Sequence, residues 1–176
     1  PLNTLEMQKR VNRTIRVSPE QIMKIAEELY NKGFISYPRT ETDRFPQDFD
    51  YDGTIRNLHD HPTFGFHARA LSNENRFRLP GNGGHDDQAH PPIYPTKLAS
   101  ANDYNSWRNG NFGESMVKIY EFVCRHFLAA CSLPAIAHQT KVEIEMGGET
   151  FRATGIMIKE FNYLDVYGRG PAQGPR

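Results

Sequence analysis

The 176-residue sequence lacks an excess of charge of either sign, because 21 lysines and arginines balance 21 aspartates and glutamates. A protein that binds nucleic acid through its overall charge is basic, so any such contact must come from a local patch. One basic patch lies near the start of the chain and faces a single acidic residue, Glu6; its members are Lys9, Arg10, Arg13 and Arg16. On charge alone, a solvated helix face is the favoured interpretation.

Cysteine is also scarce, with only Cys124 and Cys131 in the whole sequence. They lie seven residues apart in a helical pattern, which favours a buried pair of small apolar side chains over a disulfide. No apolar run is long enough to span a bilayer and no signal-peptide pattern opens the chain. These absences indicate a protein without a membrane span in a reducing intracellular compartment. Because the sequence starts at Pro1 without an initiator methionine, we expect it to be part of a longer protein.

The most strongly predicted element is a helix over residues 19–32. Ser18 is a typical N-cap and Pro19 suits the first helical position, while Gly33 ends the pattern. Between them, apolar residues recur at helical spacing: Ile22, Ile25, Ala26 and Leu29. A second apolar stripe predicts another long helix: Met116, Ile119, Tyr120, Val123, Phe127 and Ala130. Weaker patterns indicate short helices over residues 4–13 and 65–73, whereas the Asn-rich residues 99–113 are typical of a surface loop or insertion.

Beyond Pro134 the apolar period changes to two, as Val142, Ile144 and Met146 alternate with charged residues. Gly147 and Gly148 then predict a hairpin turn into a second strand. Further strands are expected over residues 156–158 and 163–166. The predicted fold class is therefore α+β, a mainly helical domain followed by the start of an antiparallel sheet, with a boundary near residues 132–137.

A tyrosine stands at the exit of a short apolar run, in Phe34-Ile-Ser-Tyr-Pro-Arg-Thr-Glu-Thr42. Pro38 favours an extended backbone at Tyr37, so the side chains of Tyr37 and Arg39 should share a face. Transesterification of a phosphodiester needs a hydroxyl nucleophile and a fixed cation near the phosphate oxygens, and the planar fork of arginine can bond two of them. Taken alone, a tyrosine before a proline is more typical of an ordinary turn.

A second polar segment contains His85, Asp86, Asp87 and His90. Its spacing fits no standard zinc pattern, and the prolines that follow indicate a rigid loop. We therefore prefer a polar loop that delivers His90 to a site assembled elsewhere. Considered alone, His90 would be interpreted as a surface histidine in a proline-rich turn.

Together the two segments resemble the type IA DNA topoisomerases. Residues 34–42 are similar to the family's active-site tyrosine motif, and Gln88-Ala-His-Pro-Pro-Ile-Tyr-Pro-Thr96 is similar to its second motif, in the same order and at a similar distance. The resemblance runs from about Pro1 to Val166 and is weakest over residues 48–84. The proline after Tyr37, Glu41 and the two prolines after His90 are closer to eukaryotic topoisomerase III than to bacterial topoisomerase I.

This resemblance implies specific roles. Tyr37 matches the nucleophile that forms a 5′-phosphotyrosine with a cut single strand of DNA, and Arg39 matches the arginine that positions the scissile phosphate. His90 matches a histidine that supports phosphate binding. Two neighbouring motif positions and two cations of the basic patch complete the expected DNA contacts: Glu41, Gln88, Lys9 and Arg13. Religation would need no ATP, because the phosphotyrosine link keeps the energy of the phosphodiester.

The resemblance also implies a domain plan. Residues 1–134 would form a winged-helix-like catalytic tyrosine domain, residues 135–167 part of the β-rich gate domain, and residues 168–176 a flexible terminus unlike the family. The family's Toprim domain, with its Mg²⁺ and general acid, is absent from this sequence, so the chain alone is expected to be inactive. The implied partners are single-stranded DNA, a RecQ-type helicase and OB-fold accessory proteins. The expected location is the nucleus, with the mitochondrion as the alternative.

Two other classes of function stay open at this stage. A non-enzymatic single-stranded-DNA-binding module would hold DNA without cutting it, and trapping a covalent tyrosine adduct would separate it from the enzyme. A purely structural fragment would use Tyr37 as a strand-end aromatic. Burial of Tyr37 away from any basic groove would favour that fragment.

Overall fold

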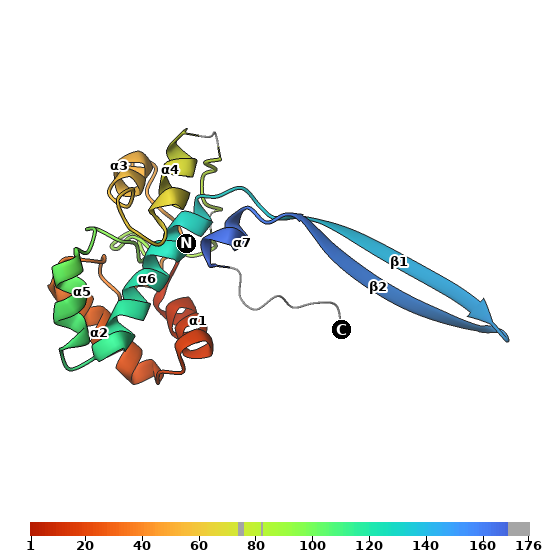
Figure 1. Cartoon of the computed structure of the whole chain (residues 1–176), viewed down its shortest axis with the longest axis horizontal. Helices are drawn as coiled ribbons and strands as arrows, with labels where there is room; N and C mark the ends of the chain where they lie inside the picture. Colours follow the sequence, from red (N-terminus) through yellow and green to blue (C-terminus); the bar gives the residue numbers. More distant parts are fainter. Residues whose placement is uncertain (74–75, 82, 169–176) are drawn as a thin grey trace.

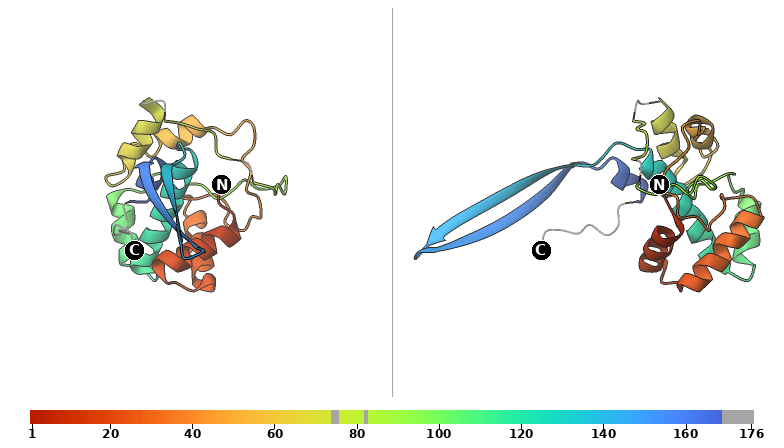
Figure 2. Two further views of the ribbon diagram at one scale, coloured as in Figure 1. Left: turned by 90° about the vertical axis from the view of Figure 1, so that its right-hand side faces the viewer. Right: turned by 180° about the vertical axis from the view of Figure 1, so that it is seen from behind.

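The computed structural model describes residues 1–73, 76–81 and 83–168, and these residues form a helical body from which a β-hairpin projects (Figures 1 and 2). The elements of the described residues are α1 (Thr4–Ile15), α2 (Pro19–Asn31), α3 (Tyr51–Arg56), α4 (Gly65–Asn73), α5 (Ala101–Arg108), α6 (Gly113–Ala130), β1 (Ile136–Met146), β2 (Glu149–Glu160) and α7 (Tyr163–Val166). Helices with one antiparallel pair of strands confirm the α+β class. The winged-helix-like description stays a prediction.

Helix α6 runs through the centre of the helical body and contacts α1, α2, α4, α5 and α7 (Figure 1). Five of its six predicted core positions are buried, whereas Ala130 at its last turn is half-buried. Tyr120 and Phe127 are the largest of the buried side chains of α6. The predicted helix is therefore confirmed, and it forms the hydrophobic centre against which these five helices pack.

Helix α2 confirms the strongest of the sequence predictions. The Ser18 hydroxyl accepts a hydrogen bond from the backbone N–H of Gln21 at 3.3 Å, and Pro19 occupies the first turn. All four predicted apolar positions are fully buried, and Gly33 follows the helix with a φ of 79° that an L side chain would strain. The shorter predicted helices also form, as α1 and α4, although α1 continues to Ile15.

The prediction of a surface loop over residues 99–113 is wrong, because residues 101–108 form α5. Ser100 and Asp103 make a capping box, in which each side chain bonds the other residue's backbone N–H. Tyr104 and Trp107 are buried in the core, and Trp107 meets Phe34 edge-on with ring centroids 4.8 Å apart. Two aromatic side chains thus outweigh the high Asn and Gly content. Helix α3 was not predicted either, and it begins with Asp50 accepting from Gly53 N–H.

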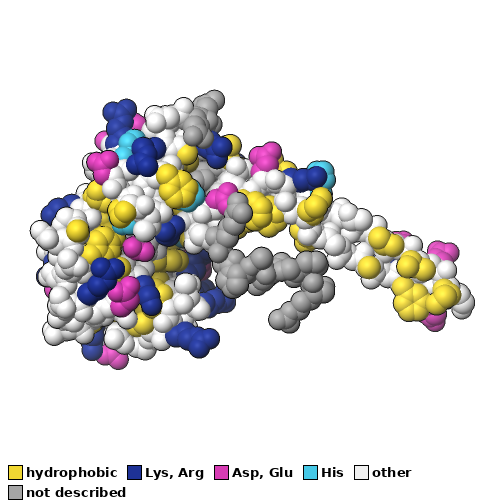
Figure 3. All heavy atoms as spheres, in the orientation of Figure 1, with side chains coloured by type: hydrophobic (Ala, Val, Ile, Leu, Met, Phe, Trp, Pro, Cys, Tyr) yellow, Lys and Arg dark blue, Asp and Glu magenta, His cyan; other side chains and the backbone are white. Residues whose placement is uncertain are grey.

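The two strands pair in antiparallel register from Val142 opposite Ala153 to Met146 opposite Glu149, and Gly147 and Gly148 form the predicted turn with φ values of 63° and 83°. Every residue of both strands is exposed, and Figure 3 shows apolar side chains along the projecting hairpin. The strand pattern is therefore confirmed. Within the described residues, however, no element covers either face of the hairpin.

The prediction of a strand over residues 163–166 is wrong, because these residues form the short helix α7. Val166 is buried against α6, and the Arg125 guanidinium donates to its carbonyl oxygen at 2.7 Å. Packing on a helix decides the conformation, since residues 1–73, 76–81 and 83–168 contain no third strand beside the hairpin. The predicted flexible terminus lies outside the described residues except for Gly168.

Both cysteines are fully buried free thiols, as predicted. Burial raises the pKa of Cys131 to about 12 and also raises the pKa of Cys124. The described helices include none that is long and apolar enough to cross a membrane.

Candidate active site

The two sequence motifs lie side by side as extended segments. The backbone N–H of Ser36 donates to the carbonyl of Tyr94 at 2.9 Å, and that of Thr96 donates to Phe34 at 3.0 Å. The Ser36 hydroxyl donates to the Pro92 carbonyl and accepts from the Tyr94 N–H, both at 3.0 Å. These contacts bring the residue after Ser36, which is Tyr37, next to the loop that carries His90.

The pairing continues on the other side of the tyrosine. Asp43 N–H donates to the His85 carbonyl at 3.0 Å, and the Asp43 carboxylate accepts from the His85 N–H at 2.9 Å. The backbone N–H of Gly83 reaches the Asp43 carbonyl at 3.0 Å, and a Cβ at Gly83 would overlap the Asp43 side chain. Asp87 N–H donates to the Thr42 hydroxyl at 3.0 Å. The second motif is therefore attached to the first both before and after Tyr37.

Helix α1 anchors the tyrosine segment at its first residue. The Thr4 hydroxyl donates to the Pro38 and Thr40 carbonyls at 2.7 and 2.9 Å and accepts from the Thr40 N–H at 2.8 Å. The Thr4 N–H also bonds the Thr40 carbonyl at 3.0 Å. Both sides of the backbone around Tyr37 are thus held, which limits the movement of its side chain.

The Tyr37 ring is half-buried between two other rings. Tyr30 of α2 meets it edge-on with centroids 5.3 Å apart, and His90 lies on its other side at 5.1 Å with the planes tilted by 36°. The ring is thus supported while its surroundings stay open to solvent, since His90 and Arg39 are both exposed. This placement differs from the fully buried aromatic that a purely structural role would favour.

Arg39 lies beside Tyr37 and is held by an acidic residue of α2. Its Nε and Nη2 atoms are 2.6 and 2.5 Å from one carboxylate oxygen of Glu27. Glu27 is three residues before Tyr30, so both face the same side of α2. Arg39 and Tyr37 therefore contact the same face of that helix, and 59% of the Arg39 side chain remains accessible to solvent.

His90 is held in a similar way by Asp87. One Asp87 oxygen accepts from the backbone N–H groups of His90 and Ala89 at 2.8 and 2.9 Å, and the other lies 3.3 Å from His90 Nδ1. Those backbone donors, with the Thr42 hydroxyl and the His90 ring, hold the pKa of Asp87 well below its ordinary value. A charged Asp87 fixes the ring through Nδ1 and leaves Nε2 for another partner.

Glu41 and Gln88 border this group without contacting Tyr37. The Glu41 carboxylate is 3.3 Å from His85 Nε2, and its side chain is 85% exposed. Gln88 has a φ of 57°, a left-handed conformation that few residues other than glycine adopt. Its N–H donates to the Asp86 carboxylate at 2.9 Å, so the residue forms the bend that precedes His90.

Lys9 and Arg13 lie on α1, apart from the residues around Tyr37. Lys9 and Arg10 both pair with Glu6, at 3.5 and 3.0 Å. Arg13 lines a separate hollow of about 570 Å³ between α1 and α6, together with Lys118 and Arg125. From Thr4, which touches the tyrosine segment, the helix rises roughly 13 Å to Arg13. The structure thus brings together four of the six predicted DNA-contacting residues and separates these two.

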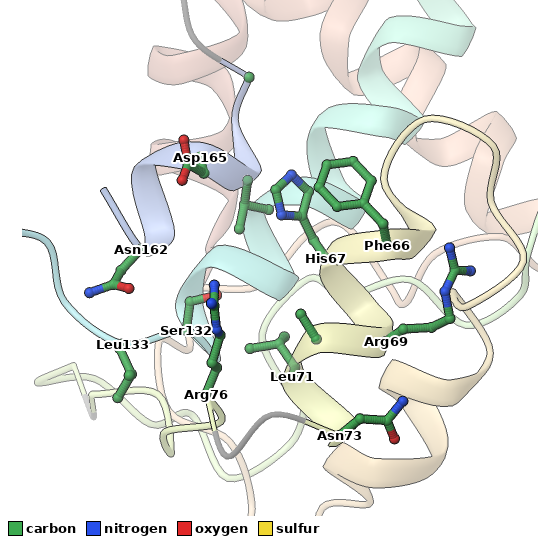
Figure 4. Close-up of a pocket in the computed structure, with 13 residues that line it drawn as sticks. Phe66, His67, Arg69, Leu71, Asn73, Arg76, Ser132, Leu133, Asn162 and Asp165 are labelled. Carbon is green, nitrogen blue, oxygen red and sulfur yellow. The ribbon is translucent and has the colours of Figure 1, made fainter. Parts of the chain in front are cut away.

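A hollow of about 790 Å³ lies at the root of the hairpin and contains none of the predicted site residues. Figure 4 shows Phe66 and His67 of α4 on one side, and Asn162 and Asp165 on the other, near the end of α6. The described residues contain no group of three or more His, Cys, Asp or Glu side chains that could hold a metal ion.

Known proteins are similar to nearly the whole of this chain. Residues 1–175 match the family described as DNA topoisomerase. The chain belongs to this family. It is 47% identical to DNA topoisomerase 3-alpha of Arabidopsis thaliana over 169 aligned residues. The aligned region covers 95% of this chain and 18% of that protein. DNA topoisomerase 3-alpha of Homo sapiens is 42% identical over 166 residues, covering 94% of this chain and 16% of that protein.

A fungal relative shows the same relationship. DNA topoisomerase 3 of Saccharomyces cerevisiae is 37% identical over 181 aligned residues, which cover 95% of this chain and 26% of that protein. The predicted membership in the type IA topoisomerases, on the topoisomerase III side, is confirmed. The chain spans about a fifth of the length of the first of these relatives. Activity, substrate and partners of a whole topoisomerase are therefore matters of proposal.

Sequence reasoning missed three residues of this candidate site: Glu27, Tyr30 and Asp87. The predicted helix gave Glu27 and Tyr30 no role, and Asp87 was interpreted only as part of the polar loop that delivers His90. A signal was present for α2, because a carboxylate and an aromatic ring three residues apart near the end of a helix share one face. That face was directed toward Tyr37 only by the reversal of the chain at Gly33.

Proposed function

We propose that this chain is the tyrosine-bearing part of a type IA topoisomerase that cuts and rejoins single-stranded DNA. The observation that carries the proposal is the position of Tyr37, half-buried between the rings of Tyr30 and His90 with the exposed Arg39 guanidinium alongside. A hydroxyl nucleophile, a cation with a planar fork and a histidine thus converge at one place on the surface. The hydroxyl can attack the phosphorus of a phosphodiester, and the arginine and the histidine can bond its oxygens.

In the proposed reaction the Tyr37 oxygen attacks phosphorus, so a P–O bond to the tyrosine forms while the P–O3′ bond breaks. The tyrosine loses its proton and the departing 3′ oxygen gains one, which leaves a 5′-phosphotyrosine and a free 3′-hydroxyl. Arg39 bonds the non-bridging oxygens as negative charge accumulates on them, and His90 donates to the phosphate from Nε2. The reverse attack by the 3′-hydroxyl restores the strand without ATP, because one phosphate ester replaces another.

Other segments and partners complete the proposed enzyme. Residues 1–134 would act as the tyrosine domain, and the hairpin within residues 135–167 would belong to a gate through which a second strand passes. Mg²⁺ and the general acid would be supplied by a Toprim domain outside this chain. A RecQ-type helicase and OB-fold proteins are the proposed partners, in the nucleus or the mitochondrion.

The test uses a grafted enzyme, in which this chain replaces the matching segment of the Arabidopsis relative. We expect the grafted enzyme to form a covalent adduct with a labelled single-stranded oligonucleotide. Tyr37→Phe should abolish the adduct while retaining oligonucleotide binding, because the ring still packs and only the attacking oxygen is lost. Arg39→Lys should lower adduct formation about tenfold or more, since one ammonium cannot reproduce a two-point contact.

Denaturing gels and fluorescence anisotropy provide the two measurements. Tyr163→Phe, a tyrosine substitution at the root of the hairpin, serves as the matched control and should form adducts normally. If the grafted enzyme made no adduct, or if Tyr37→Phe made it as well as the unchanged protein, the nucleophile assignment would be wrong.

A further inference from the structure

Arg39 does not project freely toward solvent, although more than half of its side chain is exposed. Its Nε and Nη2 atoms both contact Oε1 of Glu27, at 2.6 and 2.5 Å. An arginine side chain has many rotamers, and a contact through two nitrogens fixes the plane of the guanidinium as well as its position. The contact therefore determines where the remaining N–H groups of Arg39 point.

A guanidinium can make a two-point contact through either of two edges. Glu27 occupies the Nε–Nη2 edge, which leaves the edge formed by Nη1 and the second hydrogen of Nη2 for another acceptor. Within the described residues, Arg39 makes no other side-chain hydrogen bond. A phosphate can thus bind Arg39 without displacing Glu27.

The same face of α2 also sets the position of the tyrosine. Tyr30 is one turn beyond Glu27 and packs edge-on against the Tyr37 ring, with centroids 5.3 Å apart. Glu27 and Tyr30 therefore place the guanidinium and the phenol relative to one rigid helix, whose apolar side is fully buried. A fixed separation between nucleophile and phosphate-binding cation favours in-line attack, because misplacement of either group by about 1 Å is costly.

We propose that Glu27 is a positioning residue for Arg39 in DNA cleavage, which rests on the proposed function of Arg39 and Tyr37. Glu27 holds the guanidinium by one edge, so that the other edge meets the scissile phosphate above the Tyr37 oxygen. Glu27 itself does not touch DNA. In a competing role, Glu27 would occupy the place of the phosphate and would have to leave before DNA binds. That role predicts tighter DNA binding when Glu27 is replaced, whereas the positioning role predicts almost no change in affinity.

The experiment compares Glu27→Ala and Glu27→Gln in the grafted enzyme. Glutamine keeps an oxygen that accepts from Nε and Nη2, whereas alanine removes it. We expect Glu27→Ala to slow single-turnover adduct formation about tenfold, with oligonucleotide affinity changed less than about twofold. Glu27→Gln should retain at least about half of the rate. Glu28→Ala is the matched control, since Glu28 is the next residue of α2 and pairs only with Lys32, at 3.1 Å.

A double substitution separates positioning from a general structural effect. If Glu27 acts through Arg39, Glu27→Ala should cause no further loss in an Arg39→Ala background. An equal loss in both backgrounds would overturn the inference, as would a normal rate for Glu27→Ala. Tighter oligonucleotide binding by both Glu27 variants would establish the competing role instead. Thermal unfolding of this chain should be the same within about 1 °C for all Glu27 and Glu28 variants, because both side chains are substantially exposed.

The two proposals fail separately. Adducts that persist in Tyr37→Phe would overturn the proposed function whatever Glu27 does. Adducts that vanish in Tyr37→Phe but form normally in Glu27→Ala would overturn only the positioning role.

Discussion

Two carboxylates hold the two groups that flank the candidate nucleophile. Glu27 fixes Arg39 from α2, and Asp87 fixes His90 from the facing loop. Each acidic residue lies three positions away from a ring that packs on Tyr37, namely Tyr30 and His90. Tyr37 is therefore supported on one side by α2 and on the other by the loop that carries His90. The same two segments supply the carboxylates that accept from Arg39 and face the His90 ring. A site arranged in this way before DNA arrives needs less reorganisation when it binds.

Asp87 should matter for DNA binding through His90. Asp87→Asn keeps an oxygen for the backbone N–H groups but loses the charge and the second acceptor that faces His90 Nδ1. We expect single-strand affinity of the grafted enzyme to fall about three- to tenfold, measured by fluorescence anisotropy. Asp86→Asn is the matched control, because Asp86 bonds only the Gln88 N–H. Equal effects of the two substitutions would show that the loop, and not the orientation of the ring, is what matters.

At the scale of elements, the site depends on how the extended motifs are held between helices. The first motif follows α2 directly and is fastened by Thr4 at the start of α1. Phe34, at its beginning, packs against Trp107 of α5 and Tyr120 of α6. The helices therefore determine where Tyr37 lies on the surface of the core. The hydrogen bonds between Ser36 and residues 92–94 place the second motif beside it.

Two buried histidines should make these helices sensitive to acid. Burial lowers the pKa of His61 to about 4 and that of His126 to about 3, from an ordinary 6.5. In the pH range between these values and 6.5, the unfolded chain binds protons that the folded chain does not. The free energy of unfolding should therefore fall as the pH decreases from 6.5 toward 4, by on the order of 1–3 kcal/mol.

Urea unfolding of this chain at a series of pH values from 7.5 to 4.5 provides the measurement. His61→Gln should flatten the pH dependence, because it removes one of the two titrating groups. Glutamine can still bond the Tyr104 hydroxyl, which lies 2.7 Å from His61 Nε2, so the fold should be kept. His138→Gln, on the exposed hairpin, should leave the slope unchanged. A slope that is the same in all three proteins would show that the buried histidines do not cause it.

At the scale of the whole molecule, the chain consists of a packed helical body and a hairpin that projects from it (Figure 1). Asn162 links the two arms of the hairpin at its root, where its side-chain N–H donates to the Pro134 carbonyl at 2.8 Å. Ile144, Met146 and Phe151 are each more than half exposed near the tip. Such an apolar, two-stranded ribbon is the kind of surface that other strands or a partner cover.

The stability of this chain should therefore come from the helical body. Phe127→Ala removes a buried ring in the last turn of α6 and should lower the free energy of unfolding by about 3–5 kcal/mol. Ile144→Thr should change it by less than about 0.5 kcal/mol, because the side chain is 56% exposed on the projecting hairpin. Urea unfolding followed by circular dichroism measures both. A loss above about 2 kcal/mol for Ile144→Thr would mean that the hairpin contributes to the folded core.

This chain alone, with Mg²⁺ present, should not relax negatively supercoiled plasmid. The resemblance implies that the metal-binding acidic residues and the general acid belong to a domain outside these residues, and the general acid would supply the proton that the departing 3′ oxygen gains. Agarose gel electrophoresis of plasmid after incubation gives the result, with the grafted enzyme as the positive control. Relaxation by this chain at a rate close to that of the grafted enzyme would show that the catalytic groups have been misplaced.

Local sequence by itself determined the elements whose patterns are long and capped. Ser18, Pro19 and Gly33 delimit α2, the apolar stripe defines α6, and the glycine pair places the turn of the hairpin. In these segments capping, periodicity and turn chemistry all agree, so no tertiary contact is needed to choose the conformation. The two motifs likewise identified the family, and they predicted Tyr37 as its nucleophile.

Only the tertiary structure decided what surrounds that residue. Residues 101–108 become a helix because Tyr104 and Trp107 reach the core. Residues 163–166 become a helical turn because α6 offers a surface and the described part of the chain holds no third strand. The pairing of Arg39 with Glu27 and of His90 with Asp87 depends on segments that meet only after the chain reverses at Gly33 and returns near residue 95. Spacing along a sequence cannot show such contacts, because their geometry depends on how the helices pack beneath them.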